Sequence, residues 1–323
     1  LMFSLFGDLF SLETRGKATA AALTAVNVGG GFGQIMAGFV AGPDGSNWKL
    51  PFVIVAVPAY FIVVLLYFTV PEPPRGTKEE SLLDEDGNLL LTETYGEKVT
   101  WAKFKQLFKT PTIVLVFLQG IPASLPWGVL LGLFNDFLIE EKNVDRGPSG
   151  FVVLAFGAGA AIGAILGGYI ADWLKHKMRF IPLIMGLTTS FGAVPMILLI
   201  QLPPMSVIAY MLVSVPSGII IGITGSAVKV ILLNVATPET RGSAFSVFNL
   251  FDDLGKGGGA FVVAVIVSAL GRTTGLTISM LGWVLGAVAH FAMYFFVEKD
   301  YKNAQELIAA QAKQASAMRV SEP

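Results

Sequence analysis

The chain has 323 residues, of which 54% are hydrophobic and 14% charged, and its formal net charge is −1. Soluble domains carry about 25% charged residues, so this composition predicts an all-α polytopic membrane protein. The near-neutral charge gives no sign of nucleic-acid binding, and a chain with no cysteine and two histidines is expected to hold no metal or cofactor and not to be an enzyme.

Eight apolar stretches are long enough to cross about 30 Å of hydrocarbon, which takes about 20 helical residues. They cover residues 17–42, 50–70, 111–138, 149–172, 180–201, 206–236, 243–269 and 274–297. The predicted fold is therefore a bundle in which almost every helix spans the bilayer. Leu1 precedes Met2 and the first stretch follows closely, so we expect the start of the chain to be truncated.

The first predicted span opens with a motif that the chain uses twice. Residues 13–18 read Glu-Thr-Arg-Gly-Lys-Ala, and residues 239–244 read Glu-Thr-Arg-Gly-Ser-Ala, which open the seventh predicted span. The same offset pairs Asp8 with Asn234, Asn27 with Asp253, Gly29 with Gly255 and Gly33 with Gly259. A repeat of this kind in a membrane chain is typical of a transporter built from two related halves.

Residues 71–110 are polar and separate two predicted spans from six. Lys and Arg residues gather on the side of this linker and of the C-terminal tail, so the positive-inside rule places both in the cytoplasm. Trp101, Phe104, Leu107 and Phe108 share one helical face, which predicts a short amphipathic helix lying either in the membrane interface or on the bundle. We divide the chain into residues 1–70, 71–110, 111–297 and a tail of residues 298–323.

Small residues recur at four-residue spacing in the span over residues 149–172. Gly159, Gly163 and Gly167 would let another helix approach closely, since small residues at this spacing allow backbone contact in lipid. Gly29 and Gly33 would provide a matching surface on the first span. We expect a smooth seam between the two halves here; the alternative is that each stripe packs within its own half.

Four ionisable residues lie well inside predicted spans, where charge is costly and usually functional: Lys229, Asp252, Asp253 and Lys256. Lys256 is spaced i, i+4 from Asp252 and i, i+3 from Asp253, so one helix can pair them. In one interpretation the four residues neutralise one another as structural links. In the other, one carboxylate binds a proton or a cationic group of a substrate.

The loop after the fourth predicted span reads Gly168-Tyr-Ile-Ala-Asp172-Trp-Leu-Lys175-His-Lys177. A glycine, an acid four residues later and basic residues, together with the two-plus-six arrangement around a long linker, resemble the major facilitator superfamily without its first four helices. Trp173 stands where that family usually has a basic residue, and Lys175 where it usually has glycine. The sequence Val-Pro-Glu-Pro-Pro-Arg-Gly of residues 70–76 is similar to the spinster-like branch.

The resemblance implies where a gate and a cavity would lie. A cytoplasmic gate would form where Gly168, Asp172 and Lys175 meet the helix that Arg15 opens, with the loop of Glu239 and Arg241 making and breaking contacts nearby. The unpaired N–H groups at that helix start would stabilise the carboxylate of Asp172. Gln119 and Trp127 would face the central cavity, because the third span present here would be span 7 of the family. Asn27, the first-half partner of Asp253, is a further candidate for binding the substrate or a coupling ion.

The resemblance also implies a function: secondary transport of a small organic or amphipathic solute by alternating access. The spinster-like branch would further imply a lysolipid, sphingoid or similar substrate, coupled to protons. The expected partners are the lipid bilayer, the solute, protons and the first four helices of the chain itself. The alternative is a transport-incompetent receptor or scaffold of the same fold, which would lack those four spans.

Overall fold

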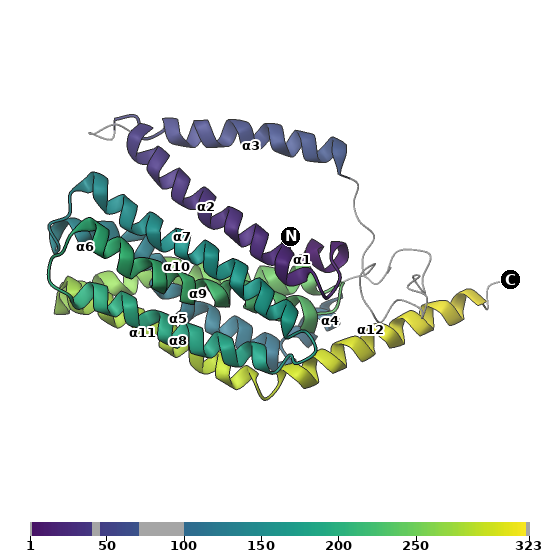
Figure 1. The fold of residues 1–323 in the computed structure, drawn as a ribbon. Coiled ribbons are helices and arrows are strands. Elements are labelled where there is room, and N and C mark those ends of the chain that lie inside the picture. The colour runs from purple at the N-terminus through teal and green to yellow at the C-terminus, as the bar shows by residue number, and fades with distance from the viewer. Residues whose placement is uncertain (1, 41–45, 71–99, 321–323) are drawn as a thin grey trace.

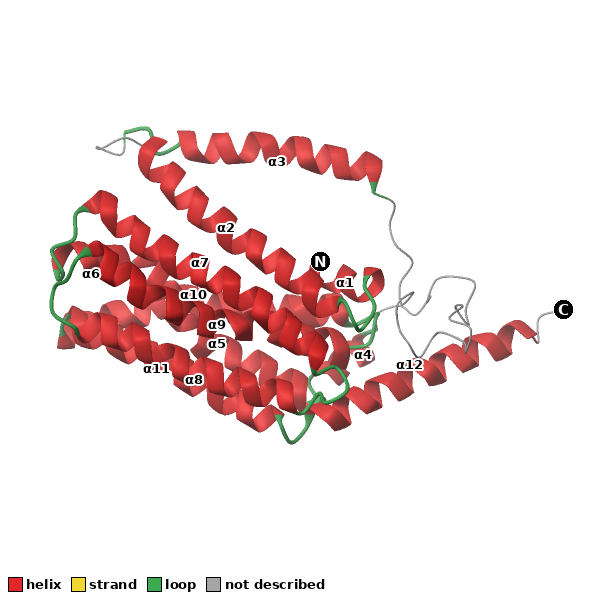
Figure 2. Ribbon diagram, in the orientation of Figure 1, coloured by secondary structure: helices red, strands yellow, loops and turns green. Residues whose placement is uncertain are grey.

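The computed structural model describes residues 2–40, 46–70 and 100–320, and this part of the chain is helical without a strand (Figures 1 and 2). Its helices are α1 (Met2–Leu9), α2 (Arg15–Val40), α3 (Leu50–Thr69), α4 (Trp101–Leu107), α5 (Pro111–Gly132), α6 (Phe134–Glu140), α7 (Arg146–Trp173), α8 (Phe180–Gln201), α9 (Val207–Val235), α10 (Arg241–Leu270), α11 (Arg272–Met293) and α12 (Val297–Val320). The proline-rich motif after residue 70 and the acidic part of the linker lie outside the described residues.

Seven of the described helices are long and apolar enough to cross a membrane: α3, α5, α7, α8, α9, α10 and α11. The predicted span over residues 17–42 is also one continuous helix, α2, although it is not among the seven found in the part of the chain that the structure describes. The predicted span over residues 111–138 is divided in two. Helix α5 ends at Gly132 and the short α6 follows from Phe134.

Helices α5 and α7–α11 form a bundle in which α7 packs on α9, α5 on α10 and α11, and α8 on α9 and α11. Helix α2 lies along α7, whereas α3 stands away from the bundle, and only 6% of its apolar stretch is buried (Figure 1). We call the end of the bundle where α1, α4 and the start of α12 lie the linker end. An apolar helix with so little protein around it suits lipid as its surroundings.

The glycine stripe of α7 packs against α9 and not against α2. A Cβ on Gly159, Gly163 or Gly167 would stand 2.0–2.3 Å from a backbone carbonyl oxygen of α9. On α10, a Cβ on Gly255 would stand 2.4 Å from the carbonyl oxygen of Ile121 of α5, and one on Gly259 would stand 2.9 Å from the side chain of Leu125. At Gly29 and Gly33, no atom of the described residues lies within 4 Å of such a Cβ. The expectation that these glycines form a seam between the two halves is therefore wrong for the stripe of α7, which packs within the six-helix bundle.

A different face of α7 meets α2. Thr24 donates a hydrogen bond to the carbonyl of Ala161 (3.4 Å), and a Cβ on Gly168 would stand 2.4 Å from the carbonyl oxygen of Gly16. Ala161 and Gly168 are seven residues apart, which is close to two full turns, so they lie on nearly the same side of the helix. Residues at four-residue spacing instead move gradually around the helix. Helix α7 thus has one small-residue face for α9 and another for α2.

The linker helix and the tail both pack on the bundle. Leu107 of α4 is buried and Phe108 lies against Phe117 of α5 with ring centroids 5.8 Å apart, while Trp101 stays exposed. Of the two interpretations of this helix, the contacts favour packing on the bundle. In α12, Asp300 is buried and one of its carboxylate oxygens accepts a hydrogen bond (2.9 Å) from the backbone N–H of Thr112, so the tail caps the N-terminus of α5.

Candidate functional site

A cavity of about 350 Å³ lies in the centre of the molecule, between α2 and the bundle. It is lined by six of the seven residues that the sequence proposes for substrate or ion binding: Asn27, Gln119, Trp127, Lys229, Asp252 and Lys256. The seventh, Asp253, does not line the cavity, and its side chain is 75% exposed. Asp252 and Asp253 are neighbours on α10, and the first directs its carboxylate into the cavity while the second points away from it.

The carboxylate of Asp252 joins α10 to α5. It accepts a hydrogen bond from the hydroxyl of Ser124 and forms an ion pair with Lys256 one turn along α10. Lys256 also lies 3.9 Å from the carboxylate of Asp253. Asp252 and Lys256 therefore offset each other's charge, as one of the two sequence interpretations expects, and Lys229 stands outside this pairing.

Lys229 of α9 presents an ammonium group to the cavity without a carboxylate at ion-pair distance among the described residues. Its Nζ lies 3.4 Å from the carbonyl oxygen of Gly225, 5.2 Å from the ring centre of Phe3 and 5.5 Å from that of Phe248. Two aromatic faces stabilise a cation but do not neutralise it. With Asp252 and Lys256 paired, the cavity wall carries the positive charge of Lys229.

Three aromatic side chains form another part of the wall. Phe156 lies 5.3 Å from Trp127 and 6.4 Å from Trp283, and the two indoles are 6.3 Å apart, all measured between ring centroids. Trp283 is 1% exposed. The cavity therefore combines a charged region with an aromatic one, an arrangement suited to a solute with a polar group and an apolar body.

At the linker end, Asp172 of α7 lies at the N-terminus of α2. Its two carboxylate oxygens accept hydrogen bonds from the backbone N–H groups of Gly16 (2.8 Å) and Lys17 (3.0 Å). These are orphan donors of a helix start, where the helix dipole also favours negative charge. Gly16 and Gly168 allow this approach, since a Cβ on Gly16 would stand 2.4 Å from the Asp172 carboxylate.

The two arginines of the repeat make reciprocal contacts between the halves. Arg15 donates a hydrogen bond to the side-chain oxygen of Asn234 (3.0 Å), and Arg241 lies 3.9 Å from the carboxylate of Asp8. Asp8 and Asn234 are themselves repeat partners, and both arginines are 1% exposed. We call these contacts the two arginine clasps. One has a carboxylate and the other a neutral amide.

Two further ion pairs complete the linker end. Lys175 pairs with Glu13 between α7 and the turn before α2, and this hydrogen bond with its charge lowers the pKa of Glu13 below the usual 4.5. Glu239 pairs with Lys103 of the linker helix at 3.3 Å and not with α2. Of the residues proposed for the gate, Glu239 thus holds α4 in place, while the others meet α1, α2 or the loop before α2.

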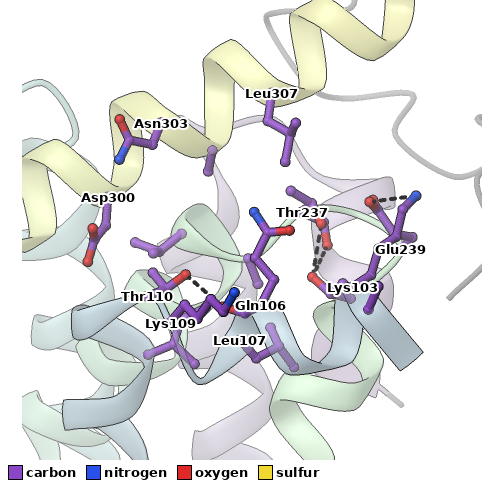
Figure 3. Close-up of a pocket in the computed structure, with 16 residues that line it drawn as sticks. Lys103, Gln106, Leu107, Lys109, Thr110, Thr237, Glu239, Asp300, Asn303 and Leu307 are labelled. Carbon is purple, nitrogen blue, oxygen red and sulfur yellow. Dashed lines mark hydrogen bonds and ion pairs between the residues drawn. The ribbon is translucent and has the colours of Figure 1, made fainter. Parts of the chain in front are cut away.

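A pocket of about 720 Å³ opens at the linker end between α4, the turn from α9 to α10, and α12. Figure 3 shows the Lys103–Glu239 pair on one side of the hollow and Asp300 and Asn303 of the tail on the other. Both acids have protein partners, with Asp300 capping α5. The pocket is the space left where the linker helix and the tail rest on the bundle.

Several site residues escaped the sequence analysis. Phe3, Phe156 and Trp283 are single aromatic residues in apolar surroundings, and nothing in the sequence distinguishes them from lipid-facing ones. Thr189 and Thr224 also line the cavity. The repeat could have indicated one contact, because it pairs Asp8 with Asn234 beside two arginines that occupy equivalent positions.

Comparison with known proteins supplies the family. Residues 1–260 match the model of the Major Facilitator Superfamily. In fold, the chain is similar to a crystal structure of a bacterial homologue of the human lysosomal transporter spinster, in an inward-facing and unoccupied conformation, with a TM-score of 0.55 and 18% identity over 94% of this chain and 74% of that one.

Curated relatives include spinster proteins and a sugar-acid transporter. Protein spinster homolog 1 of Mus musculus is 25% identical over 94% of this chain and 61% of its own length. The D-galactonate transporter of Escherichia coli O6:H1 is 29% identical over 39% of this chain and 33% of its own length. The chain thus spans about three-fifths of the spinster relative that it matches.

Proposed function

The chain belongs to the Major Facilitator Superfamily, and we propose that it moves an anionic amphipathic or small organic solute across the membrane by alternating access. The observation that carries this proposal is the central cavity, where the ammonium of Lys229, which has no carboxylate partner in the described part of the chain, faces a space walled by aromatic rings. The cavity collects three of the four intramembrane ionisable residues that the sequence singles out, Lys229, Asp252 and Lys256, and such groups are costly in lipid unless they have a function.

The charge of the cavity supports an anionic group on the solute. Asp252 is already engaged by Ser124 and Lys256, so Lys229 is the cation available to a ligand. A phosphate or carboxylate would replace its weak contacts with Phe3 and Phe248 by a charge-assisted hydrogen bond, which is roughly twice as strong as a neutral one. The aromatic region around Trp283 would hold an apolar part of the same molecule.

The contacts at the linker end support a gate that is closed in this structure. Asp172 on the start of α2, the two arginine clasps and the Glu13–Lys175 pair all join α1, α2 or the loop between them to the six-helix bundle. Opening this end requires all of them to break. We place it on the cytoplasmic side from the distribution of Lys and Arg, and four further helices of the family's N-terminal half would complete the cavity wall.

Coupling to protons, in this proposal, would use Asp252. Its carboxylate lines the cavity and lies between Ser124 and Lys256, so a shift of α10 against α5 would change its surroundings and its affinity for a proton. Asp253 has the same chemistry one residue away but does not line the cavity. The two aspartates form a matched pair for an experiment.

The test is proton flux in liposomes that contain the full-length protein, with lysophosphatidic acid and D-galactonate as added solutes. We expect solute-driven flux in the wild type, loss of flux in Asp252→Asn and retention in Asp253→Asn. Equal flux in both variants would remove Asp252 from the coupling pathway. Solute uptake without proton movement would leave transport and contradict coupling. If neither solute moves or binds, the transport-incompetent alternative is favoured for these solute classes.

A further inference from the structure

Four side chains behind the cavity wall form a hydrogen-bonded cluster that joins three helices. The Thr224 hydroxyl of α9 lies 2.9 Å from the hydroxyls of both Thr188 and Thr189 on α8, and Thr189 Oγ1 lies 3.3 Å from Nδ1 of His290 on α11. Thr189 and Thr224 line the central cavity, whereas His290 is fully buried behind them. A polar cluster in an apolar bundle calls for a reason.

The state of His290 follows from its surroundings. α5 and α8, which pack against α11, carry no Asp, Glu, Lys or Arg within their spans. On α10, Asp252, Asp253 and Lys256 pair with one another, and Lys229 of α9 is itself a cation. A buried imidazolium without a carboxylate partner would be costly, so the ring is neutral and carries one proton.

Counting protons shows how the threonine hydroxyls point. Thr188 donates to the carbonyl of Ile184 (2.9 Å) and Thr189 to that of Met185 (2.7 Å), the usual bond of a helical threonine to the residue four positions earlier. Thr189 Oγ1 therefore accepts from His290, which carries its proton on Nδ1. The buried Nε2 is left without a hydrogen-bond partner among the described residues.

The proton of Thr224 is then directed into the cluster as well. The acceptors within its reach among the described residues all belong to α8: the hydroxyls of Thr188 and Thr189 and the carbonyl of Met185 at 3.4 Å. What Thr224 can offer to the cavity is a lone pair of its oxygen, because its single proton is committed to α8. The cavity thus presents a hydrogen-bond acceptor on the wall formed by α8 and α9.

We propose that Thr224 determines specificity by accepting a hydrogen bond from a free hydroxyl of the solute, and that His290 is the positioning residue that holds Thr189 and so keeps the Thr224 proton directed inward. This inference rests on the proposed function and deepens it. The preferred solute is an anion that carries at least one unsubstituted hydroxyl near its apolar part. A solute whose hydroxyl is methylated keeps the oxygen but loses the donor, and Thr224 then gains no partner.

The test compares two probes on the full-length protein in nanodiscs: 1-oleoyl lysophosphatidic acid and its 2-O-methyl ether. We expect the wild type to bind the hydroxyl probe about tenfold more tightly than the ether, since one buried hydrogen bond corresponds to about this ratio. In Thr224→Val the ratio should fall to about one, mainly through weaker binding of the hydroxyl probe. Binding can be followed by quenching of Trp127 and Trp283 in the cavity wall.

Two variants separate recognition from loss of structure. Ser226→Ala removes a neighbouring hydroxyl of α9 that is bonded to Ala164 and does not line the cavity, so it should keep the tenfold ratio. His290→Leu should lower the ratio, and His290→Asn, which can place an N–H donor near the position of Nδ1, should restore it in part. A merely structural role of His290 would weaken both probes equally in both variants and would overturn this assignment.

The outcomes also distinguish this inference from the function on which it rests. Tight binding of both probes with a ratio near one in the wild type would keep an anion-binding cavity and overturn the role of Thr224. A tenfold ratio that persists in Thr224→Val would place the hydroxyl elsewhere and overturn it as well. Binding of neither probe would overturn the proposed solute class, and this inference with it.

Discussion

Side chains at the linker end differ greatly in how much their substitution would disturb the fold. Arg15 and Arg241 are 1% exposed and bond to backbone carbonyls as well as to partners in the other half, so their loss would leave buried acceptors unsatisfied. Glu13 is 66% exposed in its side chain and forms an ion pair with Lys175 across the gate. The exposed pair can therefore be altered without disturbing the fold.

Glu13 predicts a pH dependence. Its pKa is lowered from 4.5 by the hydrogen bond and charge of Lys175, so the pair stabilises the closed linker end above the ordinary pKa and is lost as the pH falls through the lowered one. We expect the melting temperature of the wild type to exceed that of Glu13→Gln slightly at pH 7, and this difference to disappear as the pH falls through the lowered pKa of Glu13. A difference that stays constant over this fall in pH would contradict this.

At the scale of helices, α7 is the element that joins the two parts of the molecule. Its four-residue glycine stripe meets backbone atoms of α9, and the face with Ala161 and Gly168 meets α2. The first contact brings the two backbones together directly, includes hydrogen bonds from Ser214 and Ser226 of α9 to carbonyls of α7, and belongs to the stable bundle. The second includes Asp172 and belongs to the gate. One helix can therefore stay fixed in the bundle while its other face releases α2.

This division predicts opposite effects for two glycines of α7. In Gly163→Ala the new Cβ would stand 2.0 Å from the carbonyl oxygen of Ile219, so α7 and α9 must separate, at a cost of about 1–3 kcal/mol in unfolding free energy. Gly157→Ala meets no described atom within 4 Å and should be neutral or stabilising by up to about 1 kcal/mol. Thermal unfolding in detergent measures both; equal gains in the two variants would show that helix propensity, and not contact, decides.

For the whole molecule, the two arginine clasps are equivalent contacts between the halves, because their residues occupy corresponding positions in the sequence repeat. Arg15 contacts Asn234 and Arg241 contacts Asp8, which are equivalent positions in exchanged halves. The exchange identifies the linker end as a place where corresponding parts of both halves meet. Among the contacts of the described residues, the clasp of Arg241 includes the carboxylate of Asp8 and the clasp of Arg15 the amide of Asn234, so we expect them to differ in how easily they open.

Giving both clasps a carboxylate should hold the gate closed. In Asn234→Asp, Arg15 gains a charged acceptor, which we expect to stabilise the closed linker end by about 1 kcal/mol and to slow transport several-fold. Asp8→Asn makes both clasps neutral and should shift the gate toward opening. Labelling of a cysteine introduced into the cavity, in a chain without native cysteine, reports accessibility in both variants. Equal labelling would show that the clasps do not limit opening.

Part of the site could be predicted because ionisable groups in apolar spans are rare and carry their cost wherever they lie. Lys229, Asp252 and Lys256 stood out for this reason, and the structure gathers them at one cavity. The sequence could not distinguish Asp252 from Asp253, since neighbouring residues on a helix point about 100° apart and α10 is apolar on most sides. Nor could the sequence show which neighbouring helix packs on the glycine stripe of α7.

By itself the sequence determined the helical membrane class, the positions of most spans and the repeat that relates the halves. These follow from composition and spacing along one helix, where the cost of exposing polar backbone to lipid leaves few alternatives. Only the tertiary structure decided that Lys229 stands outside the ion pair, that the arginine clasps are reciprocal and that Thr224 faces the cavity. Each depends on the rotation of one helix against its neighbours, which in lipid is set by close packing and by hydrogen bonds between helices rather than by hydrophobicity.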